Sequence, residues 1–187
     1  AMPNGKLAPF LAKRGIQAQR QVNSDSGLVY YNMEDPVVGG YTPDRIALRR
    51  AINLAQDMDT EIRTIRRGQA IPAQSPVSPN LYGHDPAAKR ENSTYDPARA
   101  KALLDMYGYV DRDGDGWRDL PDGKPLVIVR STQPEQVNRE FDTLWKKNLD
   151  AIGIKTTFNV GKWAEQLKSA RAGKLQVWSL SSSAADP

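Results

Sequence analysis

The chain has no cysteine and only one histidine, His84, among its 187 residues. Without thiols it forms no disulfide, builds no zinc–thiolate site and has no cysteine nucleophile. With a single imidazole, a transition-metal site made by this chain alone is disfavoured. The sequence also lacks a nucleophile elbow, a phosphate-binding loop and the residue pattern of a Ser–His–Asp triad. We therefore expect a protein that is not an enzyme.

Long apolar runs and blocks of one charge are missing as well. Hydrophobic residues make up 39% of the chain, charged residues 26%, and the net charge is +4. No apolar run approaches the roughly 20 residues that a membrane-spanning helix needs. The basic residues alternate with acids and are not interleaved with aromatics, so we expect no nucleic-acid partner. Length and composition predict one globular domain with its own core.

What the chain does have is an acidic stretch at residues 111–122, DRDGDGWRDLPD. Carboxylates stand at positions 1, 3, 5, 9 and 12 and a glycine at position 6, nearly the spacing of an EF-hand calcium loop. The candidate calcium ligands are the carboxylates of Asp111, Asp113, Asp115, Asp119 and Asp122 and the carbonyl of Trp117. The function that this pattern suggests is a small calcium-binding module.

The flanks of the acidic stretch favour a structural turn instead. An EF-hand loop continues into a second helix, whereas this one continues through Pro121 and Gly123 into a run that favours a strand. Position 12 is Asp122, which is shorter than the glutamate that normally binds calcium with both oxygens. We therefore expect no cofactor, with Ca²⁺ at 111–122 as the alternative.

Hydrophobic periodicity and helix-stop signals predict helices separated by strands. Helices are expected over 6–14, 42–55, 59–67, 96–107, 132–152 and 163–172, and strands over 28–33, 126–130, 154–160 and 175–180, with 17–22 extended and 69–94 a loop. Thr42 and Asp96 are expected helix caps, and Thr132 with Glu135 a capping box. This order predicts an α/β layer structure.

The motifs in this order resemble those of the family 5 extracellular solute-binding proteins of bacterial ABC importers. They are YYNMEDPVVG (30–39), DRIALRRAINLAQDMD (44–59), IRRGQAIPAQSPVSP (65–79), the run from YDPARAK to DGKPL (95–126), LDAIGIKTTF (149–158) and GKLQVWSLSSSAADP (173–187). The resemblance implies a type II periplasmic-binding-protein lobe, a mixed β-sheet flanked by helices. It implies that residues 28–187 form lobe II of a longer two-lobe receptor and residues 1–27 an N-terminal crossover segment.

The same resemblance implies capture of a solute, a peptide or another small polar molecule, in a cleft between this lobe and a lobe I. ABC permease subunits in the membrane would be the partners. The protein would be exported, to the periplasm or to the extracellular face of the membrane, although this stretch of chain shows no signal peptide. The isolated lobe is expected to be a monomer or a weak dimer. An interaction scaffold is a further alternative.

The resemblance also places the solute contacts at the end of the last strand. In peptide-binding members, an aspartate shortly after a tryptophan pairs there with the peptide's amino group. Here the candidates are Trp178, Ser179, Ser181, Ser182 and Ser183, with Asp186 later than the family position, and Asn80 and Tyr82 from the long loop. A row of hydroxyls suits a sugar, a neutral solute or a peptide backbone. The alternative is that Ser181–Ser183 is a plain linker into the other lobe.

Overall fold

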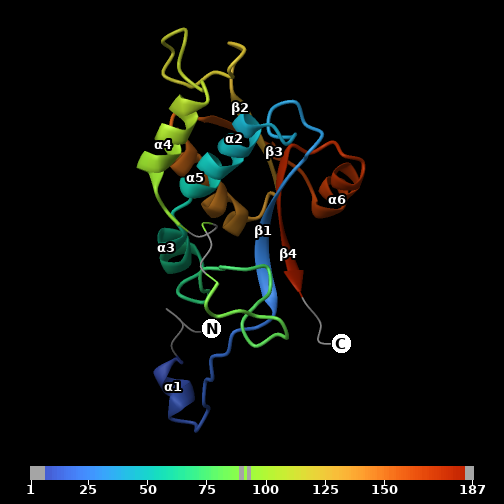
Figure 1. The fold of residues 1–187 in the computed structure, drawn as a ribbon. Helices are drawn as coiled ribbons and strands as arrows, with labels where there is room; N and C mark the ends of the chain where they lie inside the picture. The colour runs from blue at the N-terminus through green and yellow to red at the C-terminus, as the bar shows by residue number, and fades with distance from the viewer. Residues whose placement is uncertain (1–6, 89–90, 92–93, 184–187) are drawn as a thin grey trace.

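The computed structural model describes residues 7–88, 91 and 94–183 (Figure 1). The helices are α1 (Pro9–Ala12), α2 (Pro43–Leu54), α3 (Met58–Thr60), the π-helical turn η2 (Glu61–Ile65), α4 (Pro97–Met106), α5 (Gln136–Asp150) and α6 (Trp163–Arg171). The strands are β1 (Asp25–Tyr31), β2 (Val127–Thr132), β3 (Lys155–Val160) and β4 (Val177–Ser183). The expected alternation of strands and helices is confirmed.

The four strands form one mixed sheet in the order β1-β4-β2-β3. β1 pairs antiparallel with β4 over their whole lengths, from Asp25 opposite Ser183 to Tyr31 opposite Val177. β2 runs parallel to β3 along its whole length, but in the described residues it pairs with β4 only at Val177 and Trp178. The mixed α/β sheet is therefore as predicted, and most of β4 has a neighbour on one side only.

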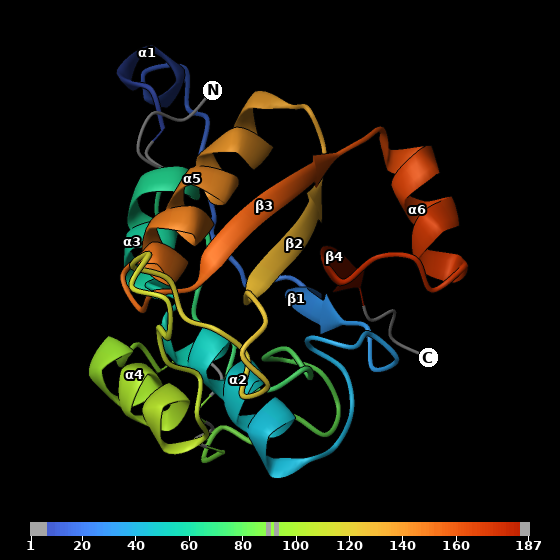
Figure 2. The same ribbon diagram turned by 90° about the horizontal axis from the view of Figure 1, so that it is seen from above.

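Helices lie on both faces of the sheet, α5 on one side and α6 on the other (Figure 2). Side chains alternate along each strand. On the α5 face, Ile128 and Val177 join a fully buried cluster with residues of α2, α4 and α5, among them Leu48, Ile52, Leu104 and Leu149. On the α6 face, the Trp178 ring lies 5.5 Å from that of Trp163. No helix in the described residues is long and apolar enough to cross a membrane.

The expected helix starts meet different outcomes. Asp96 caps α4 as predicted, because its Oδ1 accepts a hydrogen bond from the Arg99 amide at 2.9 Å. Thr42 stands at the N-cap of α2, but its side chain makes no capping hydrogen bond to a helix amide. The predicted capping box is wrong: Thr132 is the last residue of β2, and Glu135 is the N-cap residue of α5. Thr132 pairs with Val160 across the sheet, and strand pairing outweighs the local helix signal.

Two element boundaries differ from prediction in ways that affect the site. β4 was expected over 175–180 but extends to Ser183, and β1 starts at Asp25 instead of residue 28. Each strand extends the other because their backbone groups bond across one ladder, despite the modest strand preference of serine. The interpretation of Ser181–Ser183 as a linker is therefore wrong.

Other predicted segments are shorter than expected. The first helix is a single turn, α1, instead of 6–14, and residues 17–22 form no strand. The helix predicted over 59–67 is split into α3 and the π-helical turn η2, which ends at Ile65. Gly68 has the expected positive φ, and Arg67 before it has one as well. The long loop contains no helix or strand over its described residues 69–88.

Candidate functional site

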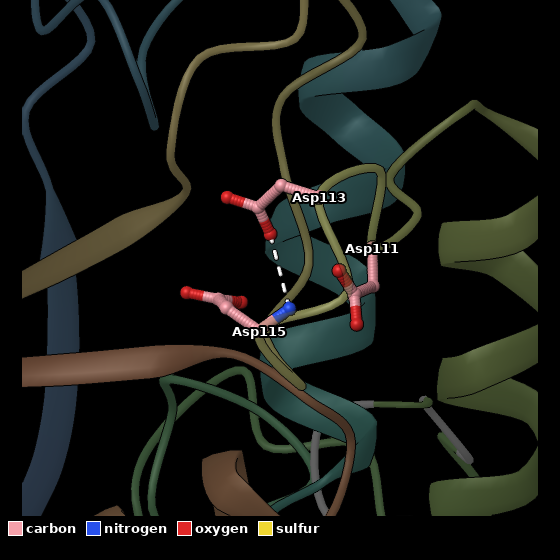
Figure 3. Close-up of side chains that lie close together, drawn as sticks. All are labelled: Asp111, Asp113 and Asp115. Atoms are coloured by element: carbon pink, nitrogen blue, oxygen red, sulfur yellow. Dashed lines mark hydrogen bonds between the residues drawn. The ribbon is translucent and has the colours of Figure 1, made fainter.

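The acidic loop satisfies its own backbone with its aspartate side chains. Each carboxylate at loop positions 1, 3 and 5 accepts at least one hydrogen bond from an amide two to five residues ahead. Figure 3 shows the three side chains and the bond from the Asp115 amide to Asp113. The bonds run to Asp111 from Gly114 (2.7 Å) and Gly116 (2.9 Å), to Asp113 from Asp115 (3.1 Å), and to Asp115 from Trp117 (2.8 Å). These are the side-chain-to-backbone bonds by which aspartate stabilises turns.

Only part of the predicted calcium ligand set comes together. Oxygens of Asp111, Asp113 and Asp115 lie within 4.8 Å of one another and are exposed. Asp119 is buried at 6% exposure, and its Oδ2 accepts a hydrogen bond from the Arg112 amide at 2.9 Å. Asp122 instead meets Lys124.

The contacts of Asp122 are local. Its Oδ1 accepts a hydrogen bond from the Lys124 amide at 3.2 Å, and its Oδ2 one from the Lys124 ammonium at 2.8 Å. The hydrogen bond from the Lys124 side chain lowers the pKa of the Asp122 carboxyl below its ordinary value. The two carboxylates late in the loop are thus committed to protein groups.

Arg118 joins this loop to the rest of the fold. Its Nε donates to the Ile152 carbonyl at 2.7 Å, and its guanidinium also meets the Tyr109 carbonyl and the Asp105 carboxylate. Its amide donates to the Gly153 carbonyl at 2.8 Å. These hydrogen bonds therefore connect the loop to the ends of α4 and α5, as expected of a structural junction. Sequence reasoning did not single out Arg118, because its partners lie on separate elements.

The predicted solute residues on the last strand occupy one free edge. β2 ends at Thr132, so in the described structure β4 has no neighbour on that side after Trp178. Among the described strands, residues 179–183 pair with β1 alone. The backbone groups along this edge are therefore available to another extended chain.

The side chains of the predicted residues are divided between the two faces of the sheet. Strand alternation places Trp178 on the α6 face and Ser179 and Ser181 on the α5 face. Within the described chain, the Ser179 hydroxyl is buried without a hydrogen-bond partner. Ser182 and Ser183 belong to β4, but their side chains, like Asp186 as a whole, lie outside the described residues.

Beside Trp178 the α6 face has a hollow of about 330 Å³. Its walls include Tyr30, Leu175 and Leu180, and none of the described residues lining it is an acid, lysine or arginine. A neighbouring hollow of about 430 Å³ is polar instead, with Glu34, Asp35 and Lys174 in its wall. The two share the short connection from α6 to β4.

The long loop reaches the same end of the sheet as the free edge. The Ser78 hydroxyl lies 2.9 Å from the Ser26 hydroxyl, and Ser26 pairs with Ser182 across the ladder. Asn80 is exposed with φ of 70°, and the Tyr82 side chain is fully exposed. Figure 1 shows this loop beside the start of β1 and the end of β4. The structure thus brings the two predicted groups of solute residues near one another, through a serine that sequence reasoning missed.

A buried ion pair supports the sheet where β2 and β4 separate. Arg130, opposite Val177, has its Nε 3.4 Å from Asp142 Oδ1 and its guanidinium 4.2 Å from the centre of the Trp145 ring. Burial lowers the pKa of Arg130 and raises the pKa of Asp142. Both shifts show that the loss of hydration outweighs the attraction within the pair.

Comparison with known proteins connects this fold to receptors. The family "Bacterial extracellular solute-binding proteins, family 5 Middle" matches residues 1–187. Heme-binding protein A of Haemophilus influenzae is 27% identical over 133 residues, which are 71% of this chain and 22% of that protein. Di/tripeptide-binding protein 2 of Pseudomonas aeruginosa is 31% identical over 127 residues, 68% of this chain and 22% of that protein. The chain thus spans about a fifth of the length of these relatives.

Among solved structures, the oligopeptide-binding protein AppA of Bacillus subtilis in complex with a nonapeptide has the same fold. The TM-score is 0.78 at 19% sequence identity, over 89% of this chain and 33% of that one. At this identity the likeness shows the fold, which is that of a type II periplasmic binding protein.

Proposed function

The chain belongs to the bacterial extracellular solute-binding proteins of family 5, and from that premise we propose that it captures a solute for an ABC importer. In this proposal residues 28–187 are lobe II of a two-lobe receptor and residues 1–27 contain a crossover. The ladder supports it, because Asp25 at the start of β1 lies opposite Ser183 at the end of β4. Two crossovers to a second lobe, one before β1 and one after β4, would therefore be adjacent where they leave this lobe.

The solute class that the geometry favours is a peptide, and the free edge of β4 is the observation that carries this proposal. An extended peptide can add to such an edge through main-chain hydrogen bonds and place alternate side chains in hollows beside it. The uncharged hollow near Trp178 and Leu180 suits an apolar side chain. The names of the relatives leave the choice open, since one is a heme-binding and one a di/tripeptide-binding protein.

The mechanism follows from binding between two lobes. A solute that contacts both lobes has higher affinity for the closed form and therefore shifts the equilibrium toward it. Permease subunits in the membrane would then recognise the closed form. The receptor would act in the periplasm or at the extracellular face of the membrane, where such a solute is encountered first.

The test is a binding measurement with the full-length receptor that contains this chain. We expect tri-alanine to raise the melting temperature and to give a binding isotherm by calorimetry. Tri-alanine with methylated backbone nitrogens is the matched control, because it cannot donate main-chain hydrogen bonds. We expect its affinity to fall at least about tenfold, the effect of losing one or two good hydrogen bonds. Stabilisation by heme or an oligosaccharide, with no response to peptides, would reject the peptide proposal.

A calcium-binding module is the alternative function. The observation in its favour is the exposed cluster of Asp111, Asp113 and Asp115. Against it stand the contacts of Asp119 and Asp122 with Arg112 and Lys124. Because calcium prefers six to eight oxygens, the three clustered side chains would need several waters to complete the shell.

A further inference from the structure

A buried serine of the long loop contacts the sheet. Among the described residues 69–88, Ser78 alone is buried, with 5% of its surface exposed. Its hydroxyl lies 2.9 Å from that of Ser26, which is itself 8% exposed. No apolar side chain in this stretch is buried, so this hydroxyl pair is a contact that burial protects from water.

Around Ser78, residues 75–84 are folded into a compact turn, here named the 75–84 turn. Its hydrogen bonds are Val77 amide to Ser75 Oγ (3.1 Å), Leu81 amide to the Ser78 carbonyl (3.3 Å), His84 amide to the Leu81 carbonyl (3.1 Å), and His84 Nδ1 with the Val77 carbonyl (3.1 Å). Positive φ values at Asn80 and Gly83 complete the reversal of the chain. Because these bonds are internal, the turn keeps its shape independently of the sheet.

We propose that Ser78 is a positioning residue, which fixes the 75–84 turn to β1 and thereby holds Tyr82 near the end of the sheet where β4 has its free edge. The register supports this assignment, because Ser26 pairs with Ser182 of β4, so the contact of the turn lies one strand away from the free edge, which is on the other side of β4. A turn with little buried contact opens far more readily than the core, as ligand-contacting loops do. The role toward the solute rests on the proposed function, whereas the anchoring does not.

The anchoring is tested by native-state proteolysis with chymotrypsin, which cleaves after tyrosine and leucine. Tyr82 and Leu81 lie within the 75–84 turn, so cleavage there reports its detachment. We expect Ser78→Ala and Ser26→Ala each to raise the cleavage rate about tenfold, the effect of losing one hydrogen bond. The double variant should cleave no faster than either single variant, since both remove the same bond.

Ser75→Ala is the matched control, because it removes a hydroxyl of the same turn that contacts no residue of the sheet in the bonds above. Its cleavage rate should stay near that of the unchanged chain. Equal rates for Ser78→Ala and Ser75→Ala would overturn the anchoring, as would additive effects of Ser26→Ala and Ser78→Ala.

The positioning role is tested with tri-alanine and the full-length receptor. We expect Ser78→Ala to speed dissociation of the peptide several-fold, with Ser75→Ala unchanged. Faster cleavage with an unchanged dissociation rate would overturn the positioning role. Absence of tri-alanine binding to the unchanged receptor would instead reject the proposed function, and with it the role toward the solute, while the cleavage rates still decide the anchoring.

Discussion

The acidic loop at 111–122 and the free edge of β4 with its neighbouring loop contrast in how their polar groups are satisfied. In the acidic loop the carboxylates are bonded to amides of the same loop, and Arg118 ties the loop to the ends of two helices. Along β4 one backbone edge is unpaired in the described chain, and the buried hydroxyl of Ser78 joins the long loop to β1 beside it. The first region is closed on itself, whereas the second is open to a ligand.

The contrast shows why a conspicuous motif and a binding site need not coincide. Charged residues at regular spacing are easily seen in a sequence, but their bonds to nearby amides are a complete structural use for them. A solute site needs groups that folding leaves accessible. The backbone of a strand with one neighbour meets that condition without any distinctive spacing in the sequence.

The largest expected effect concerns the buried ion pair of Arg130 and Asp142, which lies against the sheet where β2 and β4 separate. Asp142→Ala leaves Arg130 buried without its carboxylate, and we expect a loss of about 3 kcal/mol in the free energy of unfolding. Urea denaturation measures this loss. The combined Arg130→Met and Asp142→Leu variant is the control. It should recover most of the stability, since burial costs both charges more than their attraction returns. A double variant as unstable as Asp142→Ala would contradict that view of the pair.

The next effect tests whether the acidic loop is a structural junction. Arg118→Ala removes hydrogen bonds to the Ile152 and Tyr109 carbonyls, and we expect a loss of about 2 kcal/mol. Arg112→Ala is the matched control from the same loop. Its guanidinium bonds the Gly108 carbonyl in an exposed position, so the expected loss is below about 1 kcal/mol. Equal losses for the two variants would remove the special role of Arg118.

A smaller effect concerns the far end of the long loop. Glu91 accepts hydrogen bonds from Arg50 and pairs with Arg99 at 2.6 Å, and the bond from Arg50 lowers the pKa of Glu91. A carboxyl with a lowered pKa stabilises the fold above its unfolded pKa, and this stability is lost as the pH falls through the folded value. Glu91→Gln should therefore cost about 0.5 kcal/mol at neutral pH and nothing in strong acid. Unfolding curves of both proteins across this range would show a constant difference if Glu91 acts only by packing.

The smallest expected effect is that of calcium on the acidic loop. Asp119 and Asp122 are held by protein groups, so we expect Ca²⁺ to bind no more tightly than Mg²⁺ and a chelator to leave the melting temperature unchanged. Isothermal titration with both ions measures this. Micromolar Ca²⁺ binding that Mg²⁺ does not reproduce, and that Asp113→Asn abolishes, would make the acidic loop a metal site and remove its contrast with β4.

Local signals in the sequence predicted the elements whose interactions are themselves local. The Asp96 cap bonds an amide three residues ahead, and the turn bonds of the acidic loop span two to five residues, so the pattern contains the interaction. The capping box at Thr132 failed because that residue pairs with a strand distant in the sequence. The serine anchor was not foreseen because Ser26 and Ser78 are 52 residues apart.

By itself, the sequence determined the α/β order of elements and the family, because periodicity, helix caps and a series of motifs are properties of neighbouring residues. The tertiary structure alone decided that the serines after Trp178 lie within β4. It also left one edge of β4 unpaired there, because β2 pairs with β4 only at Val177 and Trp178 in the described residues. It also decided that Ser78 of the long loop bonds Ser26 of β1, at the same end of the sheet. Both depend on which distant segments meet, and strand register and buried hydrogen bonds are fixed only when the whole sheet forms.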